Sequence, residues 1–175
     1  MRAIDTLVIH HSASPSGDVA RFTEEHKARG FSTIGYHNVI GNGHGLPDGH
    51  IAEGRPHAQE GAGVYGNNRG KLHVCCVGNF ERPDPGFTGA PSRAQFYSLG
   101  HWLHTNGRRY RITDFRQVVG HREITIPGHG TACPGTEMPL REVRLWFQAH
   151  LGRETPAQSL DAFLASLKLP MRLTG

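Results

Sequence analysis

The chain has 175 residues and a formal net charge of +4, with 19% charged and 37% hydrophobic residues. This balance predicts one globular domain with a real core and excludes a chain that is disordered throughout. No stretch approaches 18 consecutive apolar residues and the basic residues form no run of five or more, so we expect neither a transmembrane segment nor nucleic-acid binding.

The first half of the sequence predicts three strands and a helix. The helix is expected at 18–30, where Asp18 is placed to cap its N-terminus and Gly30 to end it. The connection 41–49 joins two of the strands in a hairpin, and either forms one wall of a groove or is a solvated tip. Strands are predicted at 6–14, 34–41 and 50–55.

The second half continues the alternation of strands and helices. Ser92 and Gln95 have the spacing of a capping box at the start of a helix over 91–107. Further strands are expected at 71–80 and 115–121, and a third helix at 139–152. This order predicts a single α/β domain with a central mixed β-sheet flanked by helices.

The C-terminal segment 152–175 carries the signals of a small amphipathic helix at 155–168. Thr155 is placed as the N-cap, Pro156 follows at the first helical position, and apolar residues recur on one face. We expect this face to pack on the domain or on a second subunit; contact with a membrane surface is the alternative.

Metal-binding residue types stand at the ends of three predicted elements, in the segments VIHHSA, VVGH and GTACPG. Two histidines and one cysteine would suit Zn²⁺, which prefers imidazole nitrogen and thiolate sulfur and leaves one position for water in catalytic sites. The chain has 13 histidines, so an accidental grouping is the alternative. The cysteines are three and irregularly spaced, which does not predict a disulfide framework.

The segments VIHHSAS, GYHNVI, AEGR, CCVGNF, GHREIT and TACPG, in this order, resemble the zinc-dependent N-acetylmuramoyl-L-alanine amidases. That family includes the amidase-type phage lysozymes and the peptidoglycan recognition proteins. The resemblance implies the fold of this family, with residues 1–151 as the zinc amidase catalytic domain and 152–175 beyond it. It also implies hydrolysis of the amide between N-acetylmuramic acid and L-alanine in peptidoglycan.

Carried over by position, the resemblance implies one zinc ion held by His10, His121 and Cys133. Tyr36 then matches the catalytic tyrosine, which would donate to the attacking water or the developing oxyanion. Thr131, two residues before the cysteine, would be a second and weaker oxyanion donor, since it carries no charge.

Other residues near these motifs are expected to have different roles. His11 should face away from the metal, because neighbouring residues of a strand point to opposite faces. His129 is expected to be a loop residue, with metal binding as its alternative, and Glu123 to orient a zinc histidine or form a surface salt bridge. Many relatives carry a substrate-contacting histidine where this chain has Gly63; that contact is absent here or moved, for example to His57.

The resulting hypothesis is a peptidoglycan amidase, with a phage or prophage endolysin as the expected setting. The N-terminal apolar run is too short for a signal peptide, so we expect cytoplasmic synthesis and action on the cell wall after release. A muropeptide-recycling amidase, an injected effector, or a non-catalytic peptidoglycan-binding module on the same fold are the alternatives. A Cys/His hydrolase would use the same residue types, and sensitivity to chelators separates the two.

Overall fold

The structure, a computed structural model, describes residues 3–150. The predicted helix at 155–168 and the expected domain boundary after residue 151 lie outside the described residues. The strands are Thr6–His11 (β1), Asn38–Ile40 (β2), Ile51–Glu53 (β3), Lys71–Cys76 (β4) and Val118–Gly120 (β5). The helices are Val19–Ala28 (α1), Arg93–Tyr110 (α2) and Leu140–His150 (α3), with short 3-10 helices at Phe115–Gln117 (η1) and His121–Glu123 (η2).

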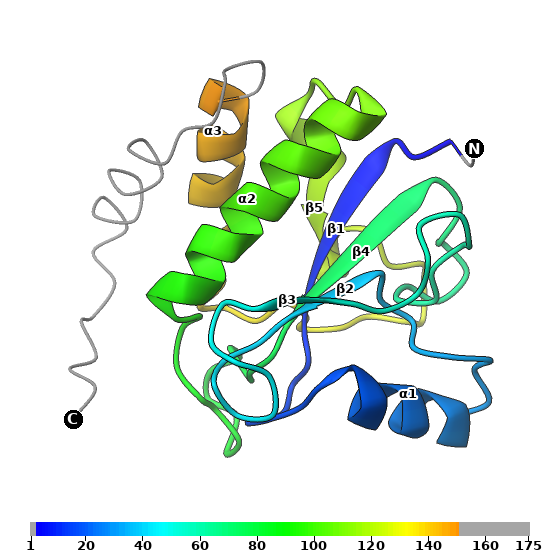
Figure 1. Cartoon of the computed structure of the whole chain (residues 1–175), viewed down its shortest axis with the longest axis vertical. Helices are drawn as coiled ribbons and strands as arrows, with labels where there is room; N and C mark the ends of the chain where they lie inside the picture. The colour runs from blue at the N-terminus through cyan, green and yellow to red at the C-terminus, as the bar shows by residue number, and fades with distance from the viewer. Residues whose placement is uncertain (1–2, 151–175) are drawn as a thin grey trace.

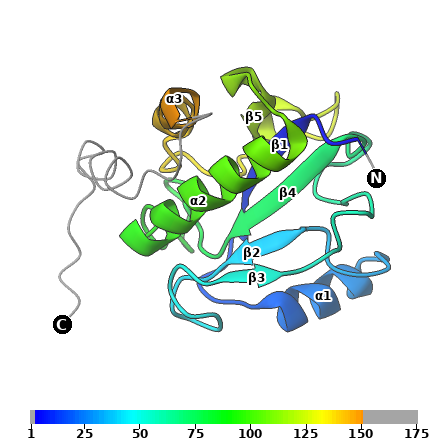
Figure 2. The same ribbon diagram turned by 45° about the horizontal axis from the view of Figure 1, so that its top comes forward.

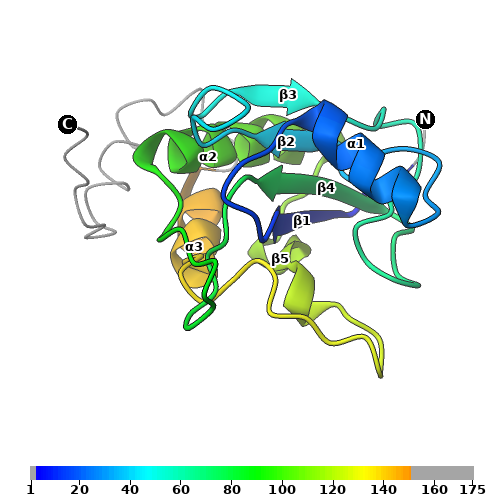
Figure 3. The same ribbon diagram turned by 90° about the horizontal axis from the view of Figure 1, so that it is seen from below.

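The strands form one mixed sheet in the order β3-β2-β4-β1-β5. β1 lies inside it and pairs in parallel with β4 on one side and with β5 on the other. β2 is parallel to β4, and β3 closes the edge antiparallel to β2 as the predicted hairpin. Figure 3 shows the strands in this order, with α1 on the near face. The predicted α/β fold with a central mixed sheet is therefore confirmed.

The two faces of the sheet have different coverings, and strand alternation assigns residues to each. Leu7 and Ile9 of β1 belong to the main apolar core, which includes residues of α2 and α3. Val8 between them joins a small cluster with Val119 on the other face, and His10 follows Val8 in the same phase. Figures 1 and 2 show α2 and α3 on one side of the sheet and α1 on the other.

The helix ends follow the predicted capping residues. The Asp18 side chain accepts from the backbone at the start of α1, and Ser92 and Gln95 form the expected capping box of α2. α2 runs past Gly107, where the prediction ended it, to Tyr110, and its C-cap residue Arg111 adopts the left-handed conformation that ends the helix. Within the described residues no helix has the length and hydropathy needed to cross a membrane.

Several strands are shorter than predicted because loop contacts take over their backbone groups. Residues 34–37 do not join β2: the carbonyls of Gly35 and Tyr36 accept from Ala62 and Arg55 in the loop after β3, at 3.0 and 2.8 Å. Residues 115–117, predicted as strand, form η1, which the Asp114 side chain caps. Both β2 and β5 therefore begin later in the sequence than predicted.

Candidate functional site

The three side chains predicted to bind zinc lie together at the C-terminal ends of β1 and β5. One ligand atom each from His10, His121 and Cys133 lies within 4.8 Å of the other two. The sulfur of Cys133 is 3.6 Å from Nδ1 of His10, and the ring centroids of His10 and His121 are 4.8 Å apart. His10 and Cys133 are buried while His121 is half-buried. The cluster thus has the donor set and partial access of a zinc site that also admits a substrate.

Each member of the cluster is held by a different part of the fold. His10 is in β1, which is hydrogen-bonded on both sides, and His121 follows directly after β5. Cys133 lies in a loop that Arg122 fastens to η2: the Arg122 backbone N–H donates to the Cys133 carbonyl at 2.8 Å, and its guanidinium donates to the Gly135 carbonyl at 3.0 Å. The ligand atoms are therefore brought together by the fold itself.

Burial sets the protonation states of the cluster. It lowers the pKa of His10 well below the usual value, helped by the nearby His73 and His121, and it also lowers the pKa of His121. Burial raises the pKa of the Cys133 thiol to about 12, although the backbone N–H of His11 donates to its sulfur at 3.4 Å. Both histidines are thus neutral, the form that binds metals, and a metal ion would have to displace only the thiol proton.

Two histidines near the cluster in sequence do not join it. His11 points to the opposite face of the sheet, where its Nδ1 accepts from the backbone N–H of Phe80 at 3.1 Å. His129 is exposed and stacks on Tyr65, with ring centroids 3.9 Å apart and planes 15° from parallel. The structure therefore separates both side chains from the three clustered ligands, as the sequence predicted.

Tyr36 lies beside the cluster, as its assignment requires. Its ring centroid is 5.1 Å from that of His10. Burial raises the pKa of the phenol well above its usual value, and the nearby Cys75 and Cys133 act in the same direction. The hydroxyl hydrogen-bonds to the side chain of Cys75. Tyr36 is therefore a protonated hydrogen-bond donor at neutral pH and above.

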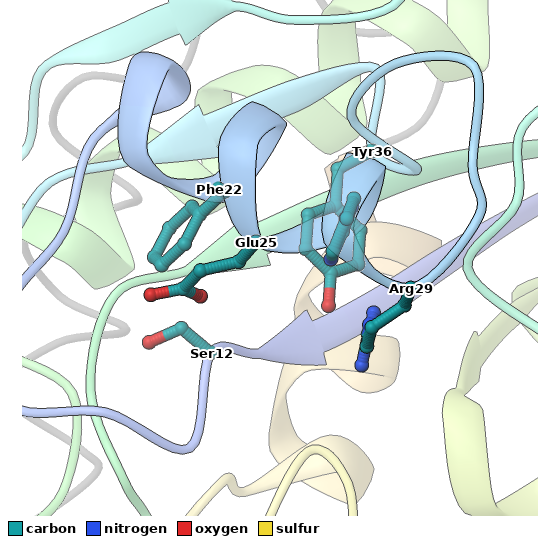
Figure 4. Close-up of a pocket in the computed structure, with 6 residues that line it drawn as sticks. Ser12, Phe22, Glu25, Arg29 and Tyr36 are labelled. Atoms are coloured by element: carbon teal, nitrogen blue, oxygen red, sulfur yellow. The ribbon is translucent and has the colours of Figure 1, made fainter.

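A pocket of about 150 Å³ lies between α1 and the end of β1. Figure 4 shows side chains from α1 and its C-terminus on one wall, with Tyr36 reaching the pocket from the segment before β2. The lining residues are Ser12, Phe22, Glu25, His26, Arg29 and Tyr36. Among these residues, Tyr36 also borders the cluster through its ring contact with His10.

Thr131 and Glu123 have local structural partners. The Thr131 hydroxyl oxygen accepts from the Cys133 backbone N–H at 3.2 Å, an arrangement that does not use the hydroxyl hydrogen. Glu123 forms an ion pair with Arg144 of α3 and accepts from the Gly120 backbone at 2.7 Å. Burial opposes ionisation of Glu123, but these bonds outweigh it and its pKa is lowered. Of its two predicted roles, Glu123 therefore has the salt bridge.

The position of Gly63 is explained by what lies against it. A Cβ atom at this residue would be 2.9 Å from Nε2 of His10. His57, considered as a replacement for a histidine at this position, instead contacts Tyr110 of α2 at 2.7 Å and Asn38 at 3.2 Å. The structure thus places His57 against α2, and a different side chain occupies the space beside Gly63.

That space is occupied by His73 of β4, which the sequence analysis did not single out. Nδ1 of His73 lies 3.0 Å from Nε2 of His10. The signal was present in KLHVCC at 71–76, because strand alternation places His73 and Cys75 on the same face, and parallel pairing sets Cys75 opposite His10. Because most residues of this predicted strand are apolar, its pattern indicates burial and assigns no role to His73.

Comparisons with known proteins agree with this geometry. A family model described as N-acetylmuramoyl-L-alanine amidase matches residues 1–136. Endolysin of Escherichia phage T7 is 30% identical over 140 residues, which cover 77% of this chain and 82% of the phage protein. The solved structure of N-acetylmuramoyl-L-alanine amidase LysC from Clostridium intestinale URNW has a TM-score of 0.69 and 28% identity, and covers 82% of this chain and 85% of that one.

Peptidoglycan-recognition proteins are also similar. Peptidoglycan-recognition protein SD of Drosophila simulans is 30% identical over 105 residues, or 60% of this chain. The match spans about half of that protein, 48% of its length. The similarity therefore extends to enzymes and to recognition proteins alike.

Proposed function

Because the chain belongs to the N-acetylmuramoyl-L-alanine amidase family, we propose that it hydrolyses the amide bond between N-acetylmuramic acid and L-alanine in peptidoglycan. The observation that carries the proposal is the grouping of His10, His121 and Cys133 within 4.8 Å, with Tyr36 beside it. A non-catalytic binding module would not need three metal-binding side chains around a partly open position.

We propose one Zn²⁺ ion as the cofactor, held by His10, His121 and Cys133. Two neutral imidazoles and a thiol match the ligand preference of zinc, and three protein ligands are the number found in its catalytic sites. Bound there, zinc would supply Lewis acidity and water that ionises near neutral pH. The backbone N–H of His11, which donates to the Cys133 sulfur, would stabilise the thiolate form.

The residues around the cluster would act on the scissile carbonyl. Tyr36 remains protonated because burial raises its pKa, so it can donate a hydrogen bond to the oxyanion that develops as water attacks the lactyl carbonyl carbon. Thr131 would donate its hydroxyl hydrogen to the same oxygen. Cys133 serves as a ligand and not as a nucleophile, so hydrolysis is direct, and a proton passes to the alanine nitrogen as it leaves.

The biological setting that fits best is that of a phage or prophage endolysin. The similarity to a phage endolysin over most of both chains supports this choice. The enzyme would then act on the bacterial cell wall after release from the cytoplasm, with peptidoglycan or its muropeptide fragments as the substrate.

Digestion of purified peptidoglycan, with the products read by mass spectrometry, tests the proposal. We expect new L-alanine amino ends and intact glycan chains, with activity lost when the metal is removed and restored by Zn²⁺. New reducing sugar ends would mean a glycosidase and overturn the proposal. Binding of muropeptides without cleavage, by zinc-loaded protein, would establish the recognition module instead.

A further inference from the structure

The second ring nitrogen of the proposed zinc ligand His10 has a specific partner. We propose that His73 is a positioning residue, which fixes the tautomer and ring orientation of His10 so that Nδ1 is presented to the metal. This inference rests on the proposed zinc site and adds a residue to it that is not itself a ligand.

The hydrogen positions follow from the contacts. Nδ1 of His10 is the atom near the Cys133 sulfur, so it must carry the lone pair when a metal is bound. The single hydrogen of the neutral ring then resides on Nε2, which lies 3.0 Å from Nδ1 of His73. The bond therefore runs from His10 as donor to His73 as acceptor. A metal-binding histidine commonly donates its other N–H in this way.

His73 is itself held in place by His37, the residue before β2. The backbone N–H of His73 donates to Nδ1 of His37 at 2.9 Å, and the backbone N–H of His37 donates to the His73 carbonyl at 2.9 Å. The two rings stack with centroids 5.5 Å apart and planes 7° from parallel. Nε2 of His37 is 3.1 Å from the Gln59 carbonyl. His73 is fully buried, so its ring has little freedom to turn away.

Two glycines leave room for this arrangement. A Cβ atom at Gly63 would lie 2.8 Å from Nδ1 of His73 and 2.9 Å from Nε2 of His10, directly against the bond between them. A Cβ atom at Gly61 would lie 2.3 Å from Cδ2 of His73. The buried histidine rings are packed and cannot move aside for an added atom. The loop can therefore pass over the His10–His73 pair only because Gly61 and Gly63 lack side chains.

Zinc affinity is the property that separates positioning from a purely structural role. In the full-length protein, His73→Leu keeps the bulk and removes the acceptor, whereas His73→Asn retains an oxygen at the place of Nδ1. We expect His73→Leu to weaken zinc binding about 10–100-fold, the usual cost of losing such a partner, and His73→Asn to restore most of the affinity. Competition with a chromophoric zinc chelator measures this without any substrate.

Matched controls come from the same chain. His150→Leu removes another hydrogen-bonded histidine, one at the end of α3 that bonds to the Trp146 carbonyl, and should leave zinc affinity unchanged. Gly63→Ala places a methyl group against the His10–His73 bond and should weaken zinc binding as His73→Leu does. Gly130→Ala, where an added Cβ meets nothing within 4 Å, should not. Near-ultraviolet circular dichroism of the zinc-free variants verifies that each is folded.

The outcomes distinguish this inference from the proposed function. If folded His73→Leu and Gly63→Ala bind zinc as tightly as the wild type, His73 is structural and the inference is overturned while the amidase remains. Equal weakening by His73→Leu and His73→Asn would also overturn it, because the acceptor would not be what matters. If the wild-type protein binds no zinc, both proposals fail.

Discussion

Replacing Tyr36 by phenylalanine tests the chemical role of a single hydroxyl group. The ring of Tyr36 contacts the rings of His10 and His26, with centroids 5.1 and 5.2 Å apart. Phenylalanine can keep both contacts. The substitution removes only the O–H and its hydrogen bond to Cys75, so we expect the free energy of unfolding to fall by no more than about 1 kcal/mol.

The expected catalytic loss is much larger than the structural one. A hydrogen-bond donor aimed at a developing oxyanion in a buried site contributes about 2.7–4 kcal/mol to the transition state, or about 10²–10³-fold in kcat. Tyr36 can supply such a donor at neutral pH, since burial and the neighbouring sulfurs raise its pKa. KM should change little, because the bond strengthens only as charge develops on the oxygen.

The assay follows the appearance of L-alanine amino ends from soluble muropeptide at several substrate concentrations, with zinc content measured on the same samples. We expect Tyr36→Phe to contain one zinc ion per chain and to lose kcat. A variant with full zinc content and a kcat near that of the wild type would refute the assignment of Tyr36 as an oxyanion donor. A proportional loss of zinc and activity would show instead that the hydroxyl supports the metal site.

Three further predictions concern the metal, pH and stability. Cys133→Ser should abolish stoichiometric zinc binding and hydrolysis while the zinc-free protein stays folded, as metal analysis and circular dichroism would show; zinc retained at wild-type affinity would contradict the ligand assignment. Burial, aided by Arg29, lowers the pKa of His26 to about 4 from 6.5. As the pH falls, the unfolded state therefore takes up the histidine proton before the folded state does. The free energy of unfolding should fall by on the order of 3 kcal/mol between about pH 6.5 and about pH 4. Urea unfolding should show this decline in the wild type and less of it in His26→Gln. Arg144→Met removes the bonds to the Val118 carbonyl and to Glu123 and should lower the unfolding free energy by about 1–2 kcal/mol with zinc stoichiometry unchanged; equal urea midpoints would contradict it.

The fold was predictable because local signals and strand periodicity agree with the tertiary structure, whereas the three proposed ligands came from the resemblance to the amidase family. Asp18 and Ser92 cap the helices that their neighbours predicted. The resemblance assigned His10 as a ligand, and strand alternation predicted that His11 faces away from it; the structure places the two side chains on opposite faces of β1. Such features depend on residues near one another in sequence, where the geometry of a strand or a helix end leaves few choices.

What the sequence did not predict depends on register and on long-range contacts. The contact between His10 and His73 follows from the register of β1 against β4, which the amino-acid sequence of either strand alone does not specify. Ile34 and Tyr36 are β-forming residues, but the backbone carbonyls of residues 35–37 are bonded to the loop after β3. In both places a partner distant in sequence decides the structure, and single-segment patterns carry no information about it.

The space shared by Gly63 and His73 constrains how this protein can evolve. A side chain added at position 63 would collide with the ring at position 73, and removal of that ring would leave a buried hole beside His10. Each single change is therefore harmful, while a larger residue at 63 combined with a smaller one at 73 would refill the same volume from the other segment. Substitutions at the two positions should be non-additive, and lineages that cross from one arrangement to the other must alter both.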